Sequence, residues 1–275
     1  MYTNFEFDKH RLSDFGCIVA NVNAGHGYRE VDIGNKISLS TFKNNKSSKQ
    51  YVVSSKYDSV YSVSLQIVKD MPRNHYNNVY FSQLEIRELM KWLNRHGYYK
   101  FQPLFDDKND CNVHYYGSFN VDEIKLDDKT IGLQANFTSN APFAFGDRIQ
   151  FTTITSSDNE YISIYGDGDD YQPIYPDISI KCLVDGHIKI TNTIYQNPEE
   201  YLFIDNCIEN EIITISSEHG IITSNMRSDE EIAKSFNYNF LVIEMYEDYC
   251  ENKYQVEVPC EITISYEPVR KVGGY

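Results

Sequence analysis

In this 275-residue chain, clustered carboxylates are the side chains that most clearly could bind a metal ion or act in catalysis. The run Gly166-Asp-Gly-Asp-Asp170 is the cluster that most suggests a metal ion. An EF-hand loop that began at Asp167 would need glycine at its sixth position and glutamate at its twelfth, but those positions hold Gln172 and Ile178. The spacing excludes an EF-hand. A polar turn before the next strand is the preferred interpretation, and adventitious Ca²⁺ binding is the alternative.

Adjacent acids elsewhere could in principle serve a glycosidase. Glu199-Glu200 and Asp229-Glu230-Glu231 are the two examples. Glycoside hydrolysis needs two carboxylates that face each other across a cleft at about 5–9 Å. Neighbouring acids in one loop do not provide that geometry, so we expect these residues to lie in solvated turns.

Nucleophilic and metal-dependent chemistry has no support in the motifs. The chain contains no G-x-S-x-G, P-loop, H-E-x-x-H or dinucleotide-binding pattern, and its seven histidines are scattered. The six cysteines show no C-x-x-C pair and no metal-ligand spacing, which favours free thiols made in a reducing cytosol. Cys17, Cys182 and Cys207 adjoin apolar residues and are expected to be buried. We therefore predict no enzyme activity, no catalytic residue, no cofactor and no metal ligand.

The elements that would have to position such residues are mainly β-strands. Aromatic residues make up 14% of the chain, with 23 tyrosines, and they favour half-buried pleated surfaces. At the amino terminus, a strand over Tyr2–Phe7 and a strand from Cys17 flank a tight Ser13–Gly16 corner. Residues Tyr61–Val68 alternate between apolar and polar, which predicts a half-buried strand. Further strands are predicted over Val113–Phe119, Val121–Leu126 and Thr130–Thr138, with a hairpin turn at Asp127-Asp128.

One good helix is predicted in the first half. Ser82 and Glu85 form a capping box, and an apolar face follows at Ile86, Leu89, Met90 and Leu93. Gly97 is the expected stop. Trp92, the only tryptophan, is expected to pack against a sheet rather than to stack on a ligand.

Two further segments of the first half are irregular. Residues 43–50 are polar and basic, with no apolar anchor, and are expected to form a long exposed loop or the tip of an arm. Pro142 and Gly146 interrupt the ladder after residue 139, so we place a linker there.

The second half is predicted to be a β-sandwich, because many short strands occur at regular spacing. The one helical hint, Asp229–Ala233, predicts at most one turn. The strands are expected over Arg148–Ile154, Glu160–Ile164, Asp177–Leu183, His187–Thr193, Tyr201–Ile204, Glu211–Ser216, Leu241–Met245 and Glu261–Tyr266.

The charge is distributed unevenly between the two halves. Residues 1–145 hold 17 Lys or Arg and 16 Asp or Glu, a net +1, whereas residues 146–275 hold 8 and 24, a net −16. This asymmetry supports two domains, 1–146 and 147–275. An acidic chain argues against nucleic-acid binding, which needs a basic patch. No run of about 18 apolar residues and no secretory signal occur, so we expect no membrane insertion.

Taken in order, several short motifs resemble the distal tail protein (Dit) family of long-tailed bacteriophages and prophages. The order and spacing of the motifs carry the resemblance, which is firm over residues 1–146 and weaker beyond. In the first half they are Ser13-Asp-Phe-Gly-Cys-Ile-Val19, Lys91-Trp-Leu-Asn94, Tyr98-Tyr-Lys-Phe101, Tyr115-Tyr-Gly-Ser-Phe119 and Ala141-Pro-Phe-Ala-Phe145. In the second half they are the pattern Tyr171-x-Pro173-x-Tyr-Pro-x-Ile-x-Ile180 and the strand Glu261–Arg270.

The resemblance implies a structural protein of the virion tail tip. The amino-terminal domain would be a β-barrel-like or split-barrel fold with one helix, forming a homo-hexameric ring between the tail tube protein and the tail-tip or baseplate hub proteins. The carboxy-terminal domain would be a galectin-like β-sandwich that can carry receptor-binding or fibre proteins. Synthesis and assembly would take place in the cytoplasm of the bacterial host.

Two alternatives remain from the sequence. A carbohydrate-binding module for adhesion to the host cell wall is one, because Tyr161, Tyr165, Tyr171 and Tyr175 could stack on a sugar. The second half holds about 130 residues, however, which leaves no room for a large inserted module, and packing in a core or interface is preferred for these rings. A tail-associated wall hydrolase is the other alternative, although no constellation of residues supports it.

Overall fold

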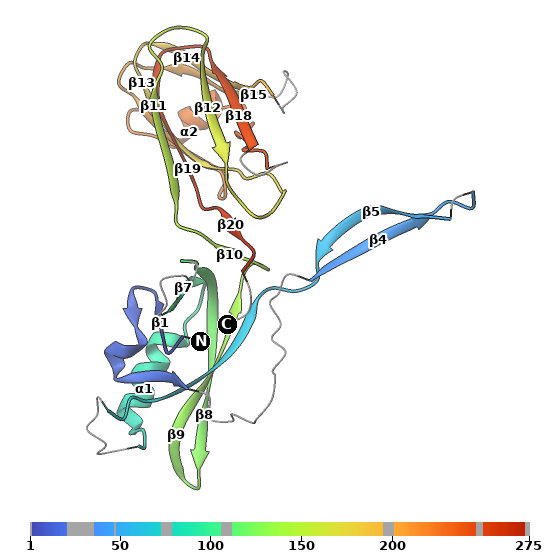
Figure 1. The fold of residues 1–275 in the computed structure, drawn as a ribbon. Coiled ribbons are helices and arrows are strands. Elements are labelled where there is room, and N and C mark those ends of the chain that lie inside the picture. Colours follow the sequence, from blue (N-terminus) through green and yellow to red (C-terminus); the bar gives the residue numbers. More distant parts are fainter. Residues whose placement is uncertain are drawn as a thin grey trace. The chain divides into compact units, whose positions relative to one another are not determined.

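The computed structural model describes residues 2–20, 36–46, 48–72, 79–105, 112–194, 201–245 and 250–272. The chain divides into two compact units, one of Met1–Gly146 with Arg270–Tyr275 and the other of Asp147–Val269. Both are mostly β, as predicted, and each has a separate hydrophobic core (Figure 1). No helix in these residues is both long and apolar enough to cross a membrane.

The first unit is built on a seven-stranded antiparallel sheet. Its edge strands are β2 and β3, so the described strands form an open sheet and do not close into a barrel. The spatial order is β2 (His10–Arg11), β1 (Asn4–Phe7), β7 (Tyr99–Leu104), β8 (Tyr115–Leu126), β9 (Lys129–Ser139), β6 (Ser62–Lys69) and β3 (Cys17–Ala20).

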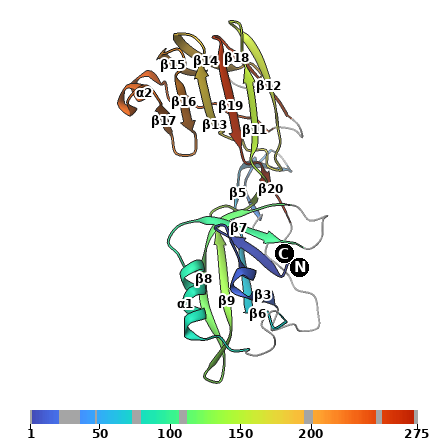
Figure 2. The same cartoon turned by 90° about the vertical axis from the view of Figure 1, so that its left-hand side faces the viewer.

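The predicted helix is α1 (Gln83–Leu93), which lies against β8 (Figure 2). The Ser82 side chain accepts a hydrogen bond from the Glu85 amide, and the Glu85 carboxylate accepts one from the Ser82 amide, which confirms the capping box. The helix ends at Leu93, before Gly97.

Trp92 anchors this helix to the sheet, as predicted. Its ring stacks on Phe15 at 4.6 Å and on Phe5 at 5.7 Å between centroids, and its Nε1 donates to the Phe7 carbonyl. Phe15 belongs to the 3₁₀ turn η1 (Leu12–Phe15), which Gly16 ends in the left-handed conformation with φ 65°. The tight corner at Ser13–Gly16 therefore serves the core of the first unit.

A separate two-stranded hairpin, here called the arm, belongs to the first unit. It consists of β4 (Ile37–Lys43) and β5 (Gln50–Tyr57), which pair with each other and with no other described strand. The predicted exposed segment 43–50 is the tip of this arm. The two strands themselves were not expected from the sequence.

The second unit is a β-sandwich, as predicted. One sheet has the order β11 (Ile149–Ile154), β19 (Cys260–Tyr266), β13 (Asp177–Cys182), β16 (Ile212–Ser216) and β17 (Ile221–Ser224). The other has the order β12 (Glu160–Gly166), β18 (Cys250–Val256), β14 (Gly186–Asn192) and β15 (Tyr201–Cys207). Isoleucines from both sheets alternate into one core, including Ile162, Ile180, Ile190 and Ile262. Outside the sandwich, the short strands β10 (Ala144–Phe145) and β20 (Val269–Arg270) form a pair.

Two predictions for the second half need correction, and two of its strands were not predicted. Leu241–Met245 is buried but is not a strand, because its one ladder contact is an isolated bridge from Ile243 to Ile174. The single helical turn is in fact α2 (Asp229–Ser235), which begins with a capping box between Ser228 and Glu231. Strands β17 and β18 were missed.

Candidate functional site

The acidic clusters that the sequence singles out have structural roles where the structure describes them. Glu231 accepts hydrogen bonds from the amide and hydroxyl of Ser228 at the start of α2, and Glu230 pairs with Lys234 one turn later. In the 166–170 turn, the Asp170 carboxylate accepts a hydrogen bond from the next backbone amide. Glu199-Glu200 lies outside the described residues.

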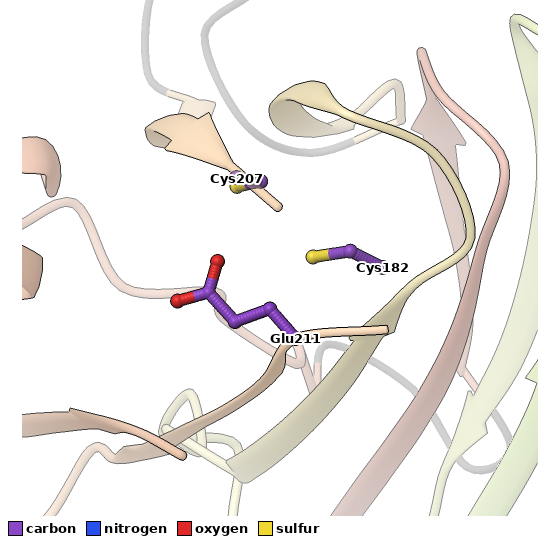
Figure 3. A group of neighbouring side chains, drawn as sticks. All are labelled: Cys182, Cys207 and Glu211. Atoms are coloured by element: carbon purple, nitrogen blue, oxygen red, sulfur yellow. The ribbon is translucent and has the colours of Figure 1, made fainter. Parts of the chain in front are cut away.

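Within the part of the chain that the structure describes, one group of side chains with metal-ligand chemistry comes together that the sequence did not reveal. Atoms of Cys182, Cys207 and Glu211 lie within 4.8 Å of one another, and all three residues are buried (Figure 3). Cys182 ends β13 and Cys207 ends β15, so the two thiols come from different sheets of the sandwich. Glu211 lies beside Cys182, whose amide donates to the Glu211 carbonyl.

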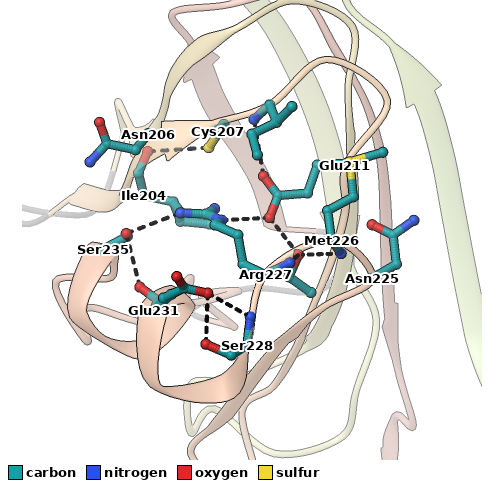
Figure 4. Close-up of polar contacts among 12 residues, drawn as sticks. Ile204, Asn206, Cys207, Glu211, Asn225, Met226, Arg227, Ser228, Glu231 and Ser235 are labelled. Carbon is teal, nitrogen blue, oxygen red and sulfur yellow. Dashed lines mark hydrogen bonds and ion pairs between the residues drawn. The ribbon is translucent and has the colours of Figure 1, made fainter.

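The Glu211 carboxylate is already occupied by protein donors. Arg227 Nε donates to Oε1 at 2.7 Å, Ser224 Oγ donates to the same oxygen, and the Ile208 amide donates to Oε2 at 3.0 Å (Figure 4). Burial raises the pKa of Glu211, but these hydrogen bonds and the Arg227 charge outweigh it, so the pKa lies below its usual value. The carboxylate is therefore held ionised by Arg227.

Arg227 joins three pieces of the second unit. Its Nη1 donates to the Asp205 carbonyl in β15 and to Ser235 Oγ at the end of α2, while its Nε holds Glu211 before β16. Removing one partner of a buried ion pair strongly destabilises the fold, because the remaining charge stays buried without compensation. This cluster therefore holds β15, α2 and the start of β16 together inside the sandwich.

The Cys182 thiol also favours a structural role. The pKa values of the two thiols shift in opposite directions. A hydrogen bond to Cys207, together with burial, raises the pKa of the Cys182 thiol, so its thiolate is disfavoured, whereas the same hydrogen bond and the Arg227 charge lower the pKa of Cys207. Cys17, Cys182, Cys207 and Cys260 are free thiols, and these four and Cys250 are buried, as the sequence predicted for three of them. Cys111 lies outside the described residues.

The arm is the surface that most needs an explanation. Its apolar side chains Ile37, Leu39, Phe42, Val52 and Val53 are between 51% and 71% exposed. A two-stranded hairpin is marginally stable at best when nothing covers it. The segment 36–57 also carries five lysines and no acidic residue. Such a surface is typical of a segment that another protein covers.

The tyrosines weighed for sugar stacking lie on the surface, so packing in the core is wrong for them. Tyr161, Tyr165, Tyr171 and Tyr175 are between 52% and 66% exposed. Tyr161 and Tyr165 share one face of β12 because residues two apart point the same way. Lys253 Nζ lies 4.8 Å from the Tyr161 ring centroid.

Comparison with protein families identifies the chain. Residues 1–141 match the model described as phage tail protein N-terminal domain, and residues 143–266 match the model described as phage tail C-terminal domain. The chain belongs to this phage tail protein family. It is thus a phage tail structural protein, as the motifs of the sequence indicated.

Solved structures show the same fold at low identity. The crystal structure of the SPP1 Dit protein, described as a paradigm of the hub adsorption apparatus in phages that infect Gram-positive bacteria, matches with a TM-score of 0.63. The identity is 12%, over 97% of this chain and 99% of that one. A chain of the phage P2 baseplate in its activated conformation with Ca matches with a TM-score of 0.51 and 8% identity, over 96% and 98% of the two chains. No curated protein matches. This phage tail protein therefore has a Dit-like fold.

Proposed function

We propose that this phage tail protein is a non-enzymatic hub subunit that forms a ring of six copies at the tail tip. Residues 1–146 form the ring, which joins the tail tube protein to the tail-tip or baseplate proteins. Residues 147–269 form an outer sandwich that carries receptor-binding or fibre proteins. The protein is made and assembled in the host cytoplasm and acts in the virion. The copy number and partners follow from the resemblance to the Dit family.

The arm is the observation that carries this proposal. It is built from exposed apolar and basic side chains on a hairpin that pairs with no other described strand. Its root is fixed, because the Tyr57 ring packs edge-on against Phe143 at 5.8 Å. A fixed root with an uncovered, apolar extension is suited to lie on a neighbouring subunit.

The charge distribution supports the assignment of inner and outer parts. The near-neutral first half tolerates close packing against copies of itself, whereas a net −16 on the second half would repel and suits a solvated position. 

Light scattering of the purified chain, alone and with its tail tube protein, tests the ring. We expect an assembly of six copies. The variant Leu39→Ser/Phe42→Ser/Val53→Ser should assemble poorly while its circular dichroism stays that of the wild type. The matched control Val60→Ser/Leu84→Ser changes exposed apolar residues outside the arm and should assemble normally. A wild-type monomer at high concentration, even with the tube protein, would contradict the proposal.

The tip of the arm allows a finer test. Phe42 and Tyr51 are opposite each other in the hairpin, so an Asn-Gly turn can replace 43–50 without changing their register. This change removes Lys43, Lys46 and Lys49 and should weaken assembly without unfolding the chain. Unchanged assembly by light scattering would show that the tip is not part of the contact.

A second candidate is carbohydrate binding by the outer sandwich. The exposed rings of Tyr161 and Tyr165 on one face of β12 favour it, because sugars stack on such rings. A glycan array and purified host walls separate the two functions. Retention on walls that is lost in Tyr161→Ala/Tyr165→Ala would support adhesion.

A further inference from the structure

An apolar hollow opens on the first unit, away from the arm. Its volume is about 360 Å³, and its lining includes Val68, Met71, Val79, Ile124, Leu126 and Ile131. Val79 and Leu126 are 52% and 56% exposed, so the hollow opens to the surface. Lys69 also lines it, but its charge is met by Glu85 at 2.7 Å. Among the described residues, the hollow is therefore an apolar site that opens to the surface and accommodates a few side chains.

The arm and the hollow lie at opposite ends of one strand. The arm leads through residues 58–61 into the start of β6 at Ser62, whereas Val68 and Lys69 at the end of β6 line the hollow. Eight residues of extended strand span about 26 Å. Two different surfaces at opposite ends of a unit give a head-to-tail contact between copies, and contacts of that kind generate rings when the rotation closes.

The apolar residues of the arm fit such a contact. Ile37 and Leu39 point to one face because they are two residues apart on β4. Val52 is opposite Thr41 in the hairpin and therefore points to the same face. This face offers three branched aliphatic side chains, all more than half exposed, to a hollow that is lined mainly by aliphatic side chains.

The charges beside the two surfaces are opposite. The arm segment 36–57 has five lysines and no acid. The hairpin end that carries Leu126 has four acids, Asp122, Glu123, Asp127 and Asp128, against two lysines, Lys125 and Lys129. Complementary charge of this kind fixes register and speeds association.

We propose that the Ile37, Leu39 and Val52 face of the arm docks in the Val79, Ile124 and Leu126 hollow of a second copy of this chain. This proposal rests on the ring proposed above and assigns the contact that closes it. The basic tip of the arm then lies near Asp127 and Asp128 of the neighbouring copy.

Cross-linking between copies tests the contact. One variant carries Leu39→Cys and another carries Leu126→Cys, and a short bis-maleimide is added to the mixture. We expect a covalent mixed dimer, and little product from either variant alone. Leu84→Cys replaces Leu126→Cys as the control, because Leu84 is exposed on α1 and does not line the hollow. A product as abundant with Leu84→Cys would overturn the proposal.

Charge reversal gives a second, independent readout. Lys43→Glu/Lys46→Glu should weaken association by at least about tenfold, and Asp127→Lys/Asp128→Lys in the same chain should restore it. The docking site would be refuted if the wild type forms its ring but the Leu39→Cys and Leu126→Cys variants give no cross-link and Asp127→Lys/Asp128→Lys does not restore association. The ring itself would then still stand. A chain that never forms a ring would refute both proposals.

Discussion

At the scale of single residues, Arg227 is the side chain whose loss should cost the second unit most. Arg227→Met leaves the ionised Glu211 buried without its partner, which costs about 3–5 kcal/mol of folding free energy. Adding Glu211→Gln should recover much of that loss. Urea unfolding followed by circular dichroism measures both. Lys234→Met is the control, since its ion pair with Glu230 is exposed and should contribute little.

The same carboxylate predicts a pH dependence. The folded pKa of Glu211 is lowered, so its contribution to stability is fully present above the unfolded value of about 4.3 and is lost as the pH falls from there through the folded pKa. The stability difference between wild type and Glu211→Gln should therefore shrink as the pH is lowered below about 4. A difference that stays constant from neutral pH to pH 3 would show that folding does not lower the pKa of Glu211.

At the scale of elements, α1 depends on its cap. Ser82→Ala removes the oxygen that accepts from the Glu85 amide and should cost the first unit about 1 kcal/mol. Urea unfolding measures this cost. Ser62→Ala, on a strand and exposed, should cost much less. Equal costs for the two variants would show that the cap contributes nothing specific.

Elements could be predicted from the sequence where one face is buried. Residues 62–69 alternate between core and surface, and α1 presents one apolar face to a sheet, so their periods reveal them. Every residue of β4 and β5 is exposed except Ser38 and Tyr57, which are half-buried, so no alternation marks the arm. The run Leu241–Met245 was predicted as a strand because it is mostly apolar. In the structure it is mostly buried, but it forms no strand ladder.

The candidate sites were harder to predict for a related reason. Cys182, Cys207 and Glu211 meet because β13 and β15 belong to facing sheets, and no local spacing encodes that meeting. The hollow likewise depends on the ends of β6, β8 and β9 lying together. The polar tip of the arm was visible in the sequence because composition alone marks it.

At the scale of the whole molecule, the two hydrophobic cores share no residue. Differential scanning calorimetry should therefore resolve two transitions. Phe119→Ala in the first core and Ile262→Ala in the second should each cost about 2–5 kcal/mol and lower one transition only. If either substitution shifts both transitions together, the chain unfolds as one cooperative body.

The stacking of Trp92 between Phe5 and Phe15 has an optical consequence. As the only tryptophan, Trp92 makes the ultraviolet emission excited at long wavelength a signal from the first unit alone. The emission wavelength of Trp92 will therefore report whether the first unit, which bears the arm, is folded, even under conditions in which the second unit is already unfolded.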